Sequence, residues 1–335
     1  MTWWADANAR ARGLGTHLLD DAAWRRLRTA PDLFVLCREL ERLGYPVEPG
    51  GEARSAERAV EQVRRERQSR ILRWLGPRSR HVRFLLEDDD RRAIRSLLRG
   101  AAAELTPPER LSVTPPSCGL TAGMVERAAR ADTPDDCLEL LAAQGQPLAL
   151  AAIEERDGLL AEWPETPTLL AHELALVRAR AARAVEGGKR GGTRLNRVLA
   201  LTLDLQNAWS ALVLVKEPAP SPDLFFVEGG AALSQDAFRE ALEAGDPAEA
   251  RATLARVLPA PVGEPFADSS LASGRLERAT LILLLRQQRR QMLHEPLGPA
   301  PLLAFLLQLR LETHDLRGLL WARALGAPLE LPEVA

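Results

Sequence analysis

The 335-residue chain has few of the side chains on which enzymes and metal proteins usually depend. Aromatic residues make up only 4% of it, and its five histidines are scattered. The three cysteines, Cys37, Cys118 and Cys137, are odd in number, widely spaced and in no metal-ligand pattern. We therefore expect ordinary reduced, partly buried cysteines, and neither a metal nor a cofactor.

Familiar catalytic motifs are also missing from the sequence. It contains no Gly-x-Ser-x-Gly, Gly-x-Gly-x-x-Gly or Cys-x-x-Cys. His172-Glu173 begins like a zinc-protease helix, but Leu176 stands where the second histidine would be. The glycine cluster 187–192 lacks the order of a phosphate-binding loop, so a flexible turn between helices is expected there. These absences favour a binding or structural role over an enzyme.

Neither the charge nor the apolar runs indicate a nucleic-acid surface or a membrane span. Lys189 and Lys216 are the only lysines beside 42 arginines, and acidic residues balance them to a net charge of −2. The start of the chain has no signal-peptide pattern. The uncharged stretch 296–309 is too short to cross a bilayer. We expect a soluble protein whose membrane contact, if any, is peripheral, with no nucleic acid and no small-molecule substrate.

Three stretches of the chain follow one pattern. Each begins with an acidic residue. An apolar residue follows four positions after the acid and a large side chain five positions after it, and two small or apolar residues come seven and eight positions after it. The acids are 114 and then 108 residues apart. The acids are Asp90, Asp204 and Glu312, and the residues five positions later are Arg95, Trp209 and Arg317.

A second landmark recurs at nearly the same period. Leu19-Asp20, Leu120-Thr121 and Leu233-Ser234 each place a residue that favours helix N-caps after a leucine. These leucines are 101 and 113 residues apart. Two landmarks in the same order indicate an internal repeat. We therefore predict three helical units, at residues 1–108, 109–218 and 219–335.

Apolar periodicity and N-cap signals predict an all-α fold. Proline-rich joints are expected at 106–117, 216–222 and 259–265, and the strand-like patch 224–230 is too short to support a sheet. The expected helices cover about 6–14, 32–43, 55–75, 80–103, 121–131, 134–143, 147–162, 167–186, 193–215, 234–244, 247–257, 271–293 and 302–325.

The signature residues allow two interpretations. Structurally, each acid caps a neighbouring helix or pairs with an arginine from another helix of its unit. In the functional interpretation, equivalent arginines of the three copies line a central opening. Arg95 and Arg317 fit this interpretation, but the equivalent residue of the middle copy is Trp209. The acid triplet 88–90 is interpreted as a solvated or arginine-paired helix face rather than a metal site.

With the three copies aligned, the chain resembles the C subunit of the central stalk of V-type/A-type rotary ATPases, whose eukaryotic counterpart is the d subunit. The resemblance rests on the segment 8–14, the three signature copies and the segment 223–234, and it covers essentially the whole length. In the middle copy, Ala208-Trp209 stands where the family tends to have Leu-Arg or Leu-Lys.

This resemblance implies a funnel of three similar helical units with pseudo-threefold symmetry. It further implies a non-catalytic rotor subunit on the cytoplasmic face of the membrane, between the shaft subunits D and F and the proteolipid ring. The complex would link ATP to proton or sodium transport. The alternative is a helical-repeat scaffold that binds other soluble proteins, and a third possibility is an unrecognised hydrolase or transferase.

Overall fold

The computed structural model describes residues 4–48, 50–115, 117–191, 193–217, 219, 221–268, 271 and 273–327. Over these residues the fold is all-α, and no strand occurs among them. The chain forms two compact units, Met1–Gly76 with Ser273–Ala335, and Pro77–Ala272. The first unit thus joins the two ends of the sequence. The division into three repeat units, with boundaries at 108 and 218, stays a prediction.

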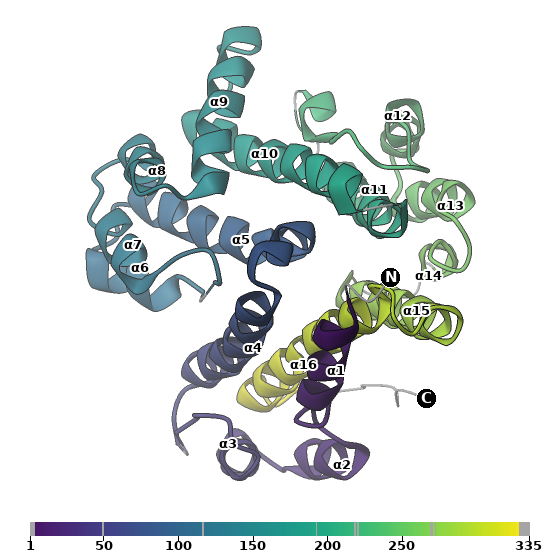
Figure 1. Cartoon of the computed structure of the whole chain (residues 1–335). Coiled ribbons are helices and arrows are strands. Elements are labelled where there is room, and N and C mark those ends of the chain that lie inside the picture. Colours follow the sequence, from purple (N-terminus) through teal and green to yellow (C-terminus); the bar gives the residue numbers. More distant parts are fainter. Residues whose placement is uncertain are drawn as a thin grey trace. The chain divides into compact units, whose positions relative to one another are not determined.

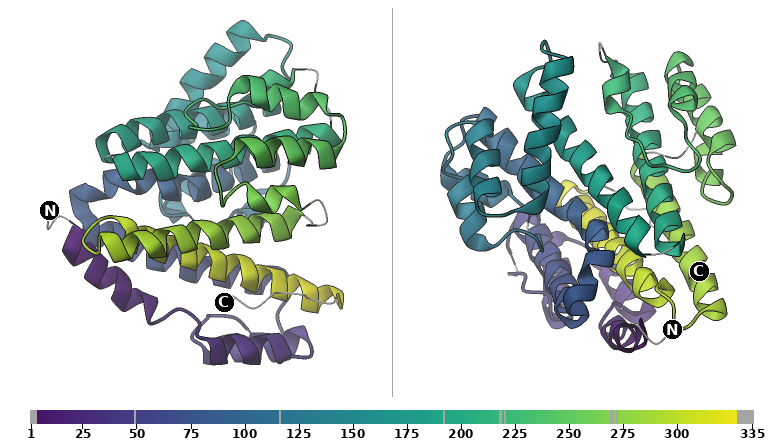
Figure 2. Two further views of the ribbon diagram at one scale, coloured as in Figure 1. Left: turned by 90° about the vertical axis from the view of Figure 1, so that its right-hand side faces the viewer. Right: turned by 45° about the horizontal axis from the view of Figure 1, so that its top comes forward.

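The first unit is built around its C-terminal helix. α16 (Ala300–Leu325) packs against α15 (Ser273–His294), α4 (Ala53–Leu75) and α1 (Ala5–Gly15), and α15 and α16 run side by side (Figure 2). The short helices α2 (Asp21–Thr29) and α3 (Leu33–Arg42) complete the unit. Its core joins both ends of the chain and contains Leu27, Leu36, Leu40, Val60, Leu316, Leu319 and Leu320.

The leucines of the C-terminal signature explain this arrangement. Leu316, Leu319 and Leu320 lie three to four residues apart on one face of α16 and are fully or almost fully buried. Burying a leucine side chain contributes about 2 kcal/mol. The apolar half of the signature therefore binds the N-terminal helices to α16.

The second unit contains the other helices of the chain. A 3-10 segment η2 (Gly76–His81) leads into it, and a second one, η3 (Pro222–Phe225), follows α11. Figure 1 shows the labelled helices. They are α5 (Arg83–Ala102), α6 (Pro107–Val113), α7 (Ala122–Ala128), α8 (Pro134–Ala143), α9 (Pro147–Glu162), α10 (Thr168–Gly191), α11 (Thr193–Lys216), α12 (Gln235–Glu243), α13 (Pro247–Val257) and α14 (Glu264–Ala267).

Alanines let the long helices of this unit approach closely. Ala149 and Ala152 of α9, and Ala175 and Ala179 of α10, are buried in one cluster with leucines of α5 and α8. Small side chains bring two helix backbones near each other, so many atoms of each helix come into contact. The composition, poor in aromatics and rich in alanine and leucine, is consistent with this packing.

The second repeat landmark consists of helix N-caps, as predicted. The side chain of Asp20 accepts the backbone N–H of Ala23 at 2.7 Å. Thr121 accepts that of Met124, and Ser234 accepts that of Ala237, each at 3.2 Å. Most other expected helices also lie within a few residues of their predicted bounds.

Two local predictions were wrong. The prolines after Thr106 do not form a joint but begin α6, because proline fits the first helical turn, where its missing N–H has no partner. The patch 224–230, predicted to be too short for a sheet, forms no strand and begins within η3, and the crossing at 259–265 runs into the short helix α14. The long helix α4 begins after Glu52 rather than at Ser55.

The glycine cluster was also interpreted wrongly as a turn. α10 continues as a helix to Gly191. A Cβ at Gly188 would lie 2.7 Å from Oδ1 of Asn196, so an alanine there would require the Asn196 side chain to move. Packing has overridden the low helix propensity of glycine. Several glycines and prolines of the expected turn, joints and final helix stop lie outside the described residues. They are Gly192, Pro116, Pro218, Pro220 and Pro328.

Candidate functional site

The three signature acids occupy equivalent positions in the fold. Asp90 lies on α5, Asp204 on α11 and Glu312 on α16, and each is at least 94% buried. Each carboxylate accepts at least one backbone N–H from the turn that precedes a short capped helix. We call each of these contacts an acid–turn clasp.

Asp204 makes the most extensive clasp. Its two carboxylate oxygens accept the N–H groups of Ala231, Ala232 and Leu233 at 3.0–3.2 Å. A Cβ at Gly230 would lie 2.1 Å from Oδ1 of Asp204, so only glycine lets the turn come this close. A carboxylate that accepts several N–H groups replaces the water it loses on burial.

Asp90 makes a smaller clasp. Its Oδ1 accepts the N–H of Gly119 at 2.8 Å, and a Cβ at Gly119 would lie 1.9 Å from its Oδ2. The amide of Gln146 lies 3.5 Å from Oδ2. Burial raises the pKa of Asp90 to about 6, the hydrogen bond from Gly119 opposes this rise, and the nearby Glu87 and Asp89 add to it.

Glu312 closes the third clasp with a longer side chain. Its Oε2 accepts the N–H of Leu19 at 2.6 Å, and its Oε1 accepts the hydroxyl of Tyr45 at 2.8 Å and the guanidinium of Arg67 at 2.7 Å. Arg67 also donates to the carbonyl of His17 at 2.7 Å. Burial, followed by the charge of Glu312, raises the pKa of the Tyr45 hydroxyl.

The clasps connect the two sequence landmarks in a cyclic order. Asp90 of the first copy binds the turn before Leu120, and Asp204 of the second binds the turn at Leu233. Glu312 of the third copy binds the turn at Leu19, which returns to the start of the chain. Each acid therefore binds the turn that begins the next predicted unit. The acids do not cap these helices, because Asp20, Thr121 and Ser234 are the N-caps; they bind the turns just before them. The role of the signature residues stays a prediction.

The residues five positions after the acids do not share a partner. Arg317 donates to Glu57 of α4, and the indole N–H of Trp321 binds the other oxygen of that carboxylate at 2.9 Å. Trp209 packs at a tilt on Phe266, with ring centroids 6.1 Å apart. Arg95 has no hydrogen bond or ion pair to any described residue, and burial lowers its pKa, with Arg91 and Arg99 adding to the effect.

The acid triplet on α5 is largely paired with arginines, as expected. Asp88 binds Arg91 at 2.9 Å, and Asp89 binds Arg92 at 2.5 Å, three residues later on the same helix. No group of three or more metal-binding side chains occurs among the described residues. Asp90 of the triplet binds the backbone N–H of Gly119.

Two residues three positions after the acids were missed by the sequence analysis. Asn207 is fully buried; its amide donates to the carbonyl of Val227 at 2.8 Å and accepts the N–H of the same residue at 2.9 Å. Asp315 is held by both nitrogens of the Arg278 fork at 2.8 and 3.0 Å. A polar residue three positions after Asp204 and after Glu312, inside an apolar helix, was the signal available in the sequence; the equivalent position after Asp90 is Ala93.

The cysteines remain thiols, as expected. Cys37 and Cys137 are buried, Cys118 is half-buried, and none forms a disulfide. Burial raises the pKa of the Cys137 thiol to about 12 and also raises that of Cys37. These two thiols are therefore poor nucleophiles at neutral pH, because the thiolate is the reactive form.

Comparison with known proteins identifies the family. The model of the family described as "ATP synthase (C/AC39) subunit" matches residues 7–332, nearly the whole chain. No curated protein matches the sequence significantly.

Proposed function

This chain belongs to the ATP synthase (C/AC39) subunit family, and we propose that it joins the rotary shaft, subunits D and F, to the membrane proteolipid ring. Members of the family are non-catalytic central-stalk subunits of V/A-type ATPases, so the chain is a subunit of a rotary ATPase and not an enzyme by itself. The observation that carries the proposal is the family match over residues 7–332.

The acid–turn clasps support a role as a rigid connector. A subunit that transmits torque must resist sliding of one helix past another. Each clasp ties a buried acid on a long helix to the turn that begins the next repeat. Charge-assisted hydrogen bonds of this kind are about twice as strong as neutral ones. The cyclic order of the clasps also supports the proposed pseudo-threefold funnel of three helical units.

A peripheral position on the cytoplasmic face is also part of the proposal. One helical segment, Leu195–Lys216 of α11, is long and apolar enough to span a membrane by length and composition. Its most apolar window is 61% buried within the protein, and α11 packs against α10, α12 and α13. These contacts support a core helix, and the complex as a whole is membrane-associated.

Co-purification tests this function directly. The full chain carrying a tag is recovered from detergent-solubilised membranes, and its partners are identified by mass spectrometry. Membranes with the untagged chain serve as the control. We expect the proteolipid together with the shaft subunits D and F. Recovery of soluble proteins alone would instead support the alternative, a helical-repeat scaffold for other partners.

A further inference from the structure

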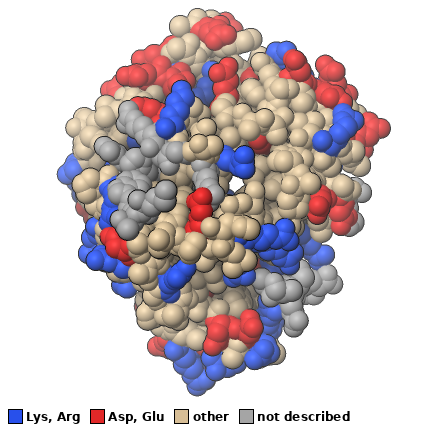
Figure 3. Space-filling model, turned by 45° about the vertical axis from the view of Figure 1, so that its right-hand side comes forward, with Lys and Arg blue, Asp and Glu red and all other residues tan. Residues whose placement is uncertain are grey.

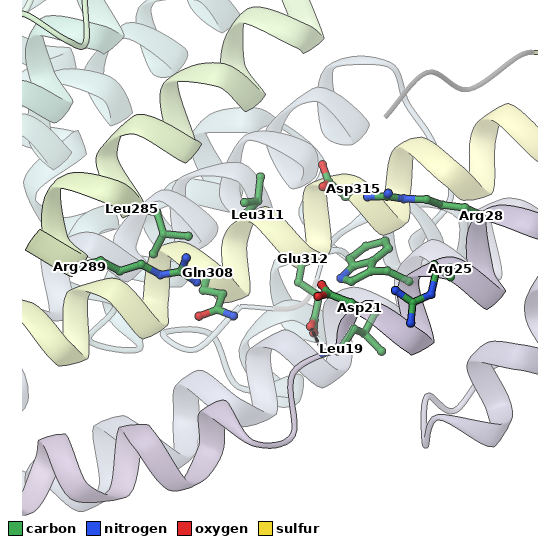
Figure 4. Close-up of a pocket in the computed structure, with 11 residues that line it drawn as sticks. Leu19, Asp21, Arg25, Arg28, Leu285, Arg289, Gln308, Leu311, Glu312 and Asp315 are labelled. Carbon is green, nitrogen blue, oxygen red and sulfur yellow. Dashed lines mark hydrogen bonds between the residues drawn. The ribbon is translucent and has the colours of Figure 1, made fainter. Parts of the chain in front are cut away.

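The first unit contains a cavity of about 310 Å³ between α2, α15 and α16 (Figure 4). Its volume is at the lower end of the range for small-ligand sites. Its wall combines arginines, carboxylates and apolar side chains. The lining residues are Leu19, Asp21, Trp24, Arg25, Arg28, Leu285, Arg289, Gln308, Leu311, Glu312 and Asp315.

Three arginines on the wall have no carboxylate partner in the part of the chain that the structure describes. Arg25 and Arg28 extend from α2, and Arg289 extends from α15 on the opposite side (Figure 4). None of the three forms an ion pair with any described residue, whereas many other arginines of the chain do. Arg28 lies over the ring of Trp24 at 5.8 Å, and its buried Nε has no hydrogen-bond partner.

The carboxylates on the wall do not neutralise these arginines. Glu312 is held by Leu19, Tyr45 and Arg67, and Asp315 is held by both nitrogens of Arg278. Asp21 is exposed at the first position of α2 and forms no ion pair with a described residue. The wall therefore carries more unpaired positive than unpaired negative charge.

The unit that contains the cavity is basic, although the whole chain is slightly acidic. Met1–Gly76 with Ser273–Ala335 holds 22 arginines against 17 acidic residues, a net charge of +5. The rest of the chain holds 22 basic and 29 acidic residues, a net charge of −7. The basic residues of this unit are all arginines, and they form a blue patch on the surface of α2 and α3 in Figure 3. A positive potential of this kind attracts anions toward the cavity.

We propose that this cavity binds a small phosphate-bearing anion. The planar forks of Arg25, Arg28 and Arg289 suit a phosphate group, which offers several acceptor oxygens to donors on different sides. The Trp24 ring and the leucines of α15 and α16 provide an apolar wall beside it. A phosphate group of this kind occurs both in free phosphate compounds and in the headgroups of phosphorylated lipids.

Two pairs of neighbouring arginines provide matched variants. Arg25→Gln and Arg289→Gln each remove a charge from the cavity wall. Arg26→Gln and Arg290→Gln remove an exposed charge from the adjacent position of the same helix, which does not line the cavity. All four are exposed arginines, so the folded state should tolerate each change. Circular dichroism confirms that each variant is folded.

Calorimetric titration of the purified full chain with pyrophosphate tests the proposal. We expect one site per chain, about tenfold weaker in Arg25→Gln and Arg289→Gln and unchanged in the two control variants. Sedimentation with phosphatidylcholine vesicles that contain phosphatidic acid is the parallel test for a lipid headgroup. The same dependence on the variants in either assay supports the proposal and identifies the source of the phosphate.

Two results would overturn it. One is the absence of binding in both assays up to millimolar pyrophosphate. The other is equal weakening by all four substitutions, since that would mean attraction to the general positive charge of the unit rather than to the cavity. Neither outcome depends on the rotary ATPase assembly, because the isolated chain is used throughout.

Discussion

At the scale of single residues, two glycines are as important as the acids they face. Gly119 and Gly230 precede capped helices at places where a Cβ would lie about 2 Å from a buried carboxylate oxygen. Neither glycine has a positive φ, so backbone conformation is not the reason that glycine is required at these two positions. The requirement is space for the carboxylate of Asp90 or Asp204.

Substitution of Gly119 by alanine should therefore break the smallest clasp. We expect Gly119→Ala to lower the free energy of unfolding by about 2–3 kcal/mol, because Asp90 must move and stays buried with one hydrogen bond fewer. Urea denaturation followed by circular dichroism measures the change. Gly158→Ala in α9 is the control: its Cβ would meet nothing within 4 Å, and it should gain about 0.5–1 kcal/mol. Equal effects of the two substitutions would contradict the clasp.

The raised pKa of Asp90 predicts a pH dependence of stability. Its pKa is about 6 in the folded chain, against 3.8 for an ordinary aspartate, so the folded state binds the proton more tightly than the unfolded state. This group therefore stabilises the fold as pH falls from 7 toward 4, and the gain is lost as pH rises through 6. Between pH 7 and pH 5, it amounts to about 1.4 kcal/mol.

Comparison with Asp90→Asn isolates this contribution, because all other titrating groups are shared. Unfolding free energies of both proteins are measured by urea denaturation from pH 7 to pH 5. The difference between the wild-type chain and the variant should shift in favour of the wild-type chain at the lower pH. A constant difference over this range would show that Asp90 ionises like an exposed aspartate.

At the scale of elements, α16 holds the N-terminal helices by two kinds of contact. Its leucines pack against α3 and α4, and Glu312 binds the turn between α1 and α2 through Leu19 and Arg67. The Glu312–Arg67 pair is largely buried, whereas the Arg317–Glu57 pair leaves its arginine 40% exposed. The two pairs should therefore differ in their effect on stability.

Breaking the buried pair should loosen α2 without removing any apolar contact. Glu312→Gln leaves the charge of Arg67 without a partner and should lower the unfolding free energy by about 3 kcal/mol. Hydrogen exchange should quicken in Asp21–Thr29. The double variant Glu312→Gln with Arg67→Met should recover part of this loss, because no unpaired charge remains.

The exposed pair provides the control at this scale. Glu57→Gln weakens the contact between α16 and α4 and should change the unfolding free energy by at most about 1 kcal/mol. If Glu57→Gln proved as costly as Glu312→Gln, burial would not be what distinguishes the two pairs.

At the scale of the whole molecule, charge is divided unevenly along the chain. The unit formed by the two ends carries +5 and the rest −7, so partners that contact either unit should respond to screening. We expect the affinity for the proposed shaft subunits D and F to fall at least tenfold between about 50 and 500 mM salt, because the Debye length shortens to a few ångströms. Surface plasmon resonance with the immobilised full chain measures it.

A control is needed because salt could also act on the fold. Circular dichroism at each salt concentration shows whether the chain stays folded. An affinity that is flat across this range, with the chain folded throughout, would mean that apolar contacts dominate shaft binding.

The sequence by itself determined the helical class, most helix bounds and the two repeat landmarks, because periodicity and N-caps are local. Asp20, Thr121 and Ser234 were predicted as N-caps because their side chains can accept N–H groups a few residues away, and in the structure they do so. The resemblance to the rotary ATPase family followed from the order of these local signals, and the family match confirmed it.

Only the tertiary structure decided what the signature acids bind. Asp204 lies 27–29 residues from its turn and Glu312 lies 293 residues from Leu19, so no local pattern relates them. The structure also continues α10 as a helix through Gly187 and Gly188 to Gly191, against the low helix propensity of glycine. The cavity between α2, α15 and α16 likewise exists only once the two ends of the chain meet. Contacts between distant segments depend on how the helices pack, and residue spacing alone does not fix that packing.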